Sequence, residues 1–65
     1  MVFEEFFNVC RADQFIIVGY TDEEGEFVEL AYGMSYKDYK DYLRNEVEAI
    51  YTKNGQIYVE IAVGE

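Results

Sequence analysis

The run Phe15-Ile16-Ile17-Val18 places four apolar residues in a row, and it constrains the fold more than any other part of the sequence. Its β-branched and aromatic residues predict a β-strand over residues 14–20. Successive side chains of a strand point to opposite faces of a sheet, so Phe15 and Ile17 face one way while Ile16 and Val18 face the other. Both faces of this strand therefore need a cover.

Two more strands are predicted. The polar residues 21–25 end in a glycine, which is typical of a hairpin turn, and residues 26–32 supply the return strand. Near the end of the chain, Lys53-Asn54-Gly55 predicts a turn, because Asn and Gly tolerate a positive φ. Residues 56–63 then alternate between apolar and polar side chains, which predicts a third strand.

A helix is predicted between the second and third strands. Ser35 followed by Asp38 has the spacing of a capping box. Apolar residues then recur at steps of three and four, which predicts a helix that ends near residue 50: Tyr36, Tyr39, Leu43, Val47 and Ile50. The order strand, strand, helix, strand predicts a single α+β domain over residues 1–65, with a three-stranded antiparallel sheet packed against one helix.

The short chain needs help to bury its core. A domain of 65 residues buries only about 60% of the surface that its unfolded chain exposes. Cys10 is the single cysteine, so an internal disulfide is excluded, and without histidine no zinc ligand set or other cofactor site is expected. Two covers for the second sheet face remain open. The N-terminal phenylalanines supply one, as a helical turn or an extended arm. The other is a homodimer in which residues 56–63 pair edge to edge with their symmetry mate and merge the two sheets.

The charge predicts a cationic protein partner. Fourteen acidic residues against five basic ones give a net charge of −9, beyond the roughly 2 to 8 that secures solubility in a small domain. Such a surface repels phosphates, so nucleic acid is not an expected ligand. The carboxylates that we predict to contact the partner are Asp22, Glu23, Glu24, Glu29, Asp38, Asp41 and Glu46.

An apolar pocket is predicted beside these acids. Tyr36, Tyr39, Tyr42 and Leu43 lie on or next to one stripe of the predicted helix and would form one wall of a groove. Tyrosine is favoured at interfaces, where one end of the ring is apolar and the other is wet. The alternative is that these residues are core, as most aromatic stripes at helical spacing are.

The sequence does not favour an enzyme. It contains no histidine and no glycine-rich phosphate loop, and so small a domain leaves no room for a cleft with paired acids. We also expect no membrane segment, because no apolar run approaches the length of a membrane span, and we expect the protein in the cytoplasm.

Part of the chain resembles a known family. Asp22-Glu23-Glu24-Gly25, the strand from Phe27 to Tyr32, and the run from Gly33 to Tyr39 are similar, in this order, to the small early proteins of protein-primed bacteriophages that inhibit uracil-DNA glycosylase. That family has an acidic run with glycine, an aromatic strand containing a glutamate, and a Gly-hydrophobic-Ser that opens a helix. Residue identity is confined to about residues 22–39.

The resemblance implies a homodimeric DNA mimic that blocks the DNA-binding groove of the host glycosylase in the bacterial cytoplasm. It implies acidic rims and an apolar pocket for the intercalating leucine of the enzyme. By position, Tyr39 takes the place of the binding aromatic and Glu29 that of the strand carboxylate, whereas Lys40 and Leu43 depart from the family pattern. Two alternatives remain: a DNA mimic directed at a restriction or CRISPR nuclease, and an acidic structural or regulatory phage protein.

Overall fold

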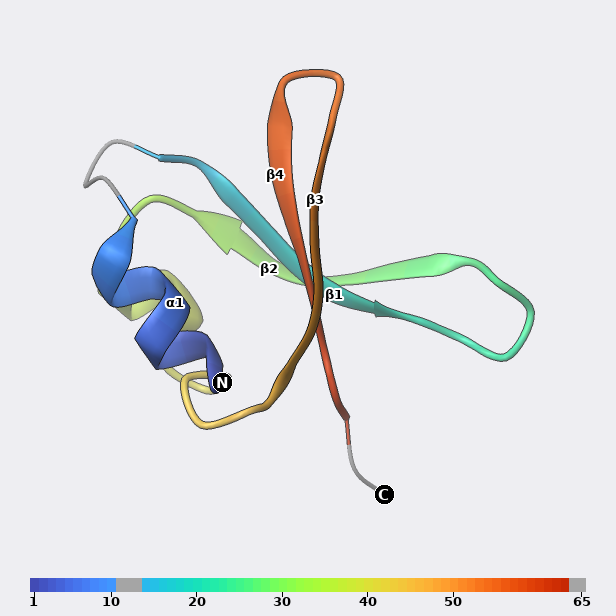
Figure 1. Ribbon diagram of the computed structural model, residues 1–65, viewed down its shortest axis with the longest axis horizontal. Helices are drawn as coiled ribbons and strands as arrows, with labels where there is room; N and C mark the ends of the chain where they lie inside the picture. The colour runs from blue at the N-terminus through green and yellow to red at the C-terminus, as the bar shows by residue number, and fades with distance from the viewer. Residues whose placement is uncertain (11–13, 64–65) are drawn as a thin grey trace.

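The fold is α+β, as predicted, with one α-helix and one four-stranded sheet (Figure 1). The structure is a computed structural model and describes residues 1–10 and 14–63. The elements in chain order are helix α1 (Phe3–Val9), strands β1 (Ile16–Thr21) and β2 (Phe27–Gly33), the short 3-10 helix η1 (Tyr36–Tyr39), and strands β3 (Val47–Lys53) and β4 (Gln56–Ile61).

The sheet is mixed, so the prediction of three antiparallel strands is wrong. Its strand order is β2-β1-β4-β3. The two hairpins β1–β2 and β3–β4 are each antiparallel, and they meet where β1 runs parallel to β4. Because β4 has β1 on one side and β3 on the other, both of its edges are occupied. The predicted edge-to-edge dimer through residues 56–63 is therefore wrong, and the outer edges of this sheet belong to β2 and β3.

The predicted helix after Ser35 is also wrong beyond its first turn. The capping contacts form, since the backbone N–H and the hydroxyl of Ser35 donate to Asp38 Oδ2 at 3.1 and 3.0 Å. The helix nevertheless stops after η1, and residues 40–44 continue as turns. The physical reason lies in the second half of the segment: Val47, Ile50 and Tyr51 are β-branched or aromatic, and they pair with β4 instead of extending a helix.

A two-residue turn explains why residues 47–53 form a strand and not the end of a helix. Asn54 and Gly55 both adopt positive φ, 55° and 79°, between the paired residues Lys53 and Gln56. Two consecutive residues with positive φ are typical of a type I′ turn, whose twist matches that of an antiparallel hairpin. The turn predicted at residues 53–55 is confirmed, but it joins two strands and not a helix to a strand.

The N-terminal phenylalanines cover one face of the sheet. Phe3 is fully buried with Ile16, Val18, Val59 and Ile61, all from the two central strands. Helix α1 is held there at its first turn, where the backbone N–H of Phe3 donates to the Asn45 carbonyl at 2.8 Å and that of Glu4 to the Leu43 carbonyl at 2.9 Å. The N-terminal segment is thus a helix, but it packs on the same face as Tyr39 and Leu43. The prediction that it covers the second face of the sheet is therefore wrong.

Candidate functional site

The sheet face opposite α1 carries no helix and is rich in aromatic side chains. The register pairs Ile17 of β1 with Tyr32 of β2 and with Tyr58 of β4, and Tyr58 with Tyr51 of β3, so these side chains share one face across all four strands. We call this surface the aromatic face, and its residues are Phe15, Ile17, Phe27, Glu29, Tyr32, Tyr51, Gln56, Tyr58 and Glu60.

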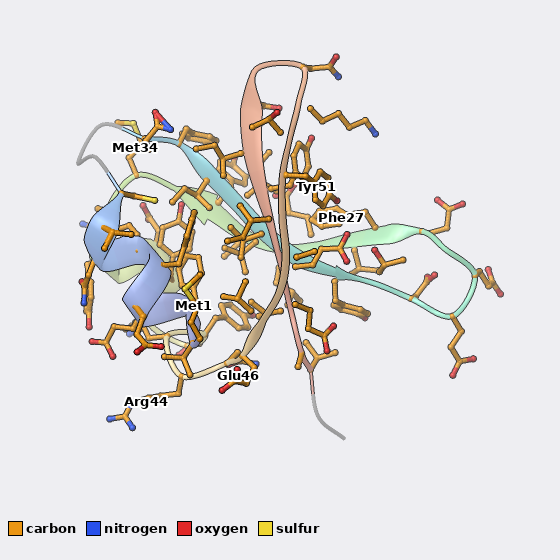
Figure 2. All side chains as sticks on the ribbon, viewed as in Figure 1. Met1, Phe27, Met34, Arg44, Glu46 and Tyr51 are labelled. Atoms are coloured by element: carbon orange, nitrogen blue, oxygen red, sulfur yellow. The ribbon has the colours of Figure 1, made fainter. Side chains whose placement is uncertain are left out.

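The rings of the aromatic face form two groups. Tyr58 stacks on Tyr51, with centroids 5.5 Å apart and planes 3° from parallel, and meets Phe27 edge-on at 5.3 Å. Phe15 and Tyr32 form the second group, with centroids 5.3 Å apart. Phe27 and Tyr51, the two rings that contact Tyr58, are labelled in Figure 2.

A glycine makes the first group possible. A Cβ at Gly19 would lie 2.5 Å from Cζ of Phe27 and would also clash with the carbonyl oxygen of Val28. The Phe27 ring therefore lies over the backbone of β1 and reaches Tyr58 on the next strand. A side chain at position 19 would separate the two rings.

The aromatic face is accessible to a partner although its floor is buried. Tyr32 is 57% exposed, Phe15 39% and Tyr51 36%, whereas Ile17 between them is only 7% exposed. A shallow hollow of about 350 Å³ opens here, lined by Phe15, Ile17, Glu29, Tyr32, Gln56 and Tyr58. The second sheet face thus has an apolar floor covered by the aromatic residues around it and not by another element.

Two carboxylates of this face differ in their surroundings. Oε2 of Glu60 accepts hydrogen bonds from the hydroxyls of Thr21 at 2.8 Å and Tyr51 at 2.9 Å. Burial and this bond to Glu60 raise the pKa of the Tyr51 hydroxyl, which stays protonated as a donor. Glu29 is exposed, and its carboxylate forms no hydrogen bond or ion pair with residues 1–10 or 14–63. Its charge is available to a ligand.

The predicted apolar pocket residues do come together, but they cover the core. Tyr39 is fully buried, its ring lies 5.1 Å from that of Phe3, and its hydroxyl donates toward the carbonyl oxygens of Ile16, at 2.8 Å, and Gly33. Tyr42 and Leu43 are half-buried against the same core. An anchor must be reachable by its partner, so the burial of Tyr39 argues against the predicted role.

Tyr36 is the exposed member of that predicted pocket. Its ring packs on Phe7 at 5.8 Å, and its hydroxyl donates to Glu4 Oε2 at 2.6 Å. That hydrogen bond raises the pKa of the Tyr36 hydroxyl. Tyr36 therefore links η1 to α1.

The predicted acidic residues lie in separate parts of the molecule. Asp22, Glu23 and Glu24 are at the β1–β2 turn, far from α1 (Figure 1). Glu29 lies on the aromatic face, and Glu46, labelled in Figure 2, pairs with the amino group of Met1 at 3.4 Å. The remaining two, Asp38 and Asp41, lie in η1 and the turns after it, so the seven do not form one patch with the predicted pocket.

Two of these acids have structural partners. Oδ1 of Asp22 accepts the backbone N–H groups of Glu24 and Glu26, both at 2.9 Å, and so holds the hairpin turn. The backbone and hydroxyl hydrogen bonds from Ser35 lower the pKa of Asp38. Glu23 and Glu24 are exposed at the tip of the turn, where their charges face solvent.

Residues 1–10 and 14–63 contain no group of three or more His, Cys, Asp or Glu that would hold a metal ion. Burial raises the pKa of the Cys10 thiol, which makes it a poor nucleophile at neutral pH. Within the same residues, no helix is long and apolar enough to cross a membrane.

The sequence contained part of the signal for the aromatic face. The run of residues 15–18 indicates that Phe15 and Ile17 share a face that needs a cover, whereas the contributions of β3 and β4 depend on the strand order.

Comparisons with protein families, with curated proteins and with solved structures find no match to this chain.

Proposed function

We propose that this protein is a stoichiometric inhibitor that binds the cationic DNA-binding groove of an enzyme and acts without chemistry of its own. The observation that carries the proposal is the uncompensated negative charge. The chain has a net charge of −9, and the one ion pair within residues 1–10 and 14–63 joins Glu46 to the amino group of Met1.

The basic side chains of the described residues do not neutralise this charge. Lys37, Lys40, Arg44 and Lys53 form no ion pair with the acidic residues of the described ranges, and Arg44 points away from the body of the molecule (Figure 2). Unpaired carboxylates repel one another and lower the stability of the compact state. A cationic partner relieves that repulsion and is drawn toward the surface from a distance.

The aromatic face supplies the contact that holds such a partner. Rim charges mainly raise the rate of encounter, whereas desolvated aromatic anchors slow dissociation. Tyr32, Phe15 and Tyr51 are exposed and flank a buried apolar floor. The binding surface that we propose is therefore the aromatic face, in place of the helix shoulder around Tyr39.

Uracil-DNA glycosylase is the target that the sequence resemblance indicates. The test is uracil release from DNA by purified glycosylase, with and without a molar equivalent of this protein. The proposal predicts loss of activity that is complete near one equivalent and is reduced by Tyr32→Ser. Unaltered release would rule out this target, and parallel assays with restriction and CRISPR nucleases would then separate a DNA mimic directed elsewhere from an acidic protein with no such role.

A further inference from the structure

We propose that the hollow of the aromatic face binds an arginine side chain of the partner protein, an inference that rests on the proposed function. The hollow is lined by Phe15, Ile17, Glu29, Tyr32, Gln56 and Tyr58. At about 350 Å³ it lies at the small end of the range of ligand pockets, which suits one long side chain better than an extended ligand.

The walls of the hollow favour a cation. Phe15 and Tyr32 form one wall of the hollow, and Tyr58 of β4 forms the opposite wall. Ile17 lies between them as an apolar floor. A cation over an aromatic face is attracted by the ring quadrupole, and the attraction is strongest when water is excluded. The floor and the rings also accept the apolar stem of a long basic side chain.

Glu29 supplies the opposite charge at the same place. Its carboxylate is exposed, lines the hollow, and has no partner among residues 1–10 and 14–63. The other carboxylate of this face, Glu60, already accepts hydrogen bonds from Thr21 and Tyr51. Glu29 is thus the acid whose hydrogen-bonding capacity remains for a ligand.

Arginine fits these groups better than lysine does. A guanidinium is planar, stacks on aromatic rings, and presents parallel N–H donors that match a carboxylate in a bidentate pair. The amide oxygen of Gln56 is a further acceptor at the edge of the hollow. Lys53 pairs with Gln56 across the β3–β4 hairpin, so its positive charge opposes a bound cation.

The test uses three peptides that differ in one residue: acetyl-Gly-Ser-Arg-Ser-Gly-amide and the same peptide with lysine or citrulline at the centre. Each is titrated into the ¹⁵N-labelled protein, and backbone amide shifts are followed by NMR. We expect saturable shifts for the arginine peptide at Phe15, Ile17, Glu29, Tyr32 and Tyr58. We also expect about fivefold weaker binding of the lysine peptide and no saturation with citrulline.

Two variants with the same change of charge locate the site. Glu29→Gln should weaken binding of the arginine peptide roughly tenfold, whereas Glu23→Gln, at the tip of the β1–β2 turn, should change it less than about twofold. Equal effects of the two variants, equal binding of all three peptides, or no shifts at the hollow would overturn the proposal.

The outcome is independent of the uracil-release assay. If the arginine peptide fails to bind but the protein still inhibits the glycosylase, the arginine pocket is wrong and the proposed function stands. If the peptide binds as expected and uracil release is unaltered, the pocket stands and the proposed target is wrong.

Discussion

Tyr39 joins the sheet to its cover through one hydroxyl. The O–H points toward the carbonyl oxygens of Ile16 and Gly33, which are partners at one end of the β1–β2 ladder. We expect Tyr39→Phe to lower the free energy of unfolding by about 1–3 kcal/mol, because the buried carbonyls lose their donor. Urea unfolding measures this. Tyr36→Phe is the matched control and should lower stability much less, because the bond from Tyr36 to Glu4 lies at the surface; equal losses would contradict the assignment.

The same hydroxyl predicts a loss of stability in alkali. Burial, together with the nearby Asp38 carboxylate, raises the pKa of Tyr39 from 10.0 to about 12. Because the folded-state pKa is the higher one, the contribution of this residue is complete below pH 10 and disappears as the pH rises through about 12. Unfolding followed by circular dichroism across this range should show the loss, and Tyr39→Phe should remove this component. A variant with the same alkaline profile would refute the prediction.

At the scale of the elements, β1, β2 and β4 could be predicted from the sequence to within a few residues. Strand β3 was missed because Val47 and Ile50 continue the helical spacing of Tyr36, Tyr39 and Leu43. The local pattern alone does not distinguish a helix from a strand here. Tyr36, Tyr39 and Leu43 pack against α1 and the core, whereas Val47 and Ile50 belong to β3. The Asn54-Gly55 pair between alternating apolar residues was the stronger signal, because it is typical of a hairpin.

The candidate site could be predicted only in part, for a topological reason. Local sequence patterns do not specify that β1 and β4 run side by side in parallel. That pairing places Tyr58 next to Ile17. It also places the Phe27 ring against Tyr58 across Gly19. Without it, the tyrosines of the 36–43 segment were the most prominent aromatic group, although they serve the core.

Helix α1 is predicted to be essential for the sheet despite its seven residues. Phe3 is fully buried, so Phe3→Ala should lower the free energy of unfolding by about 3–5 kcal/mol through lost burial and a cavity. Such a loss is a large part of the stability of a small domain. Val9→Ala on the same helix is the control, because Val9 is exposed. Thermal unfolding compares the two variants, and a similar melting temperature for both would show that α1 is not part of the core.

For the whole molecule, charge predicts opposite effects of salt on two kinds of association. The homodimer remains a prediction, and the strand edges at which it would now form are those of β2 and β3. Two copies that each carry −9 repel one another, so salt should strengthen self-association in sedimentation velocity. Salt should slow association with a cationic target about tenfold or more in stopped-flow measurements. A target on-rate that salt leaves unchanged would contradict electrostatic steering.

The most direct test of the central claim is an NMR titration of the ¹⁵N-labelled protein with uracil-DNA glycosylase. We expect signals of the aromatic face, including Ile17, Glu29, Tyr32 and Tyr58, to shift or broaden up to one equivalent, while Phe3 and Tyr39 in the core change little. A spectrum that the enzyme leaves unchanged, or changes confined to α1 and the segment around Tyr39, would contradict the account.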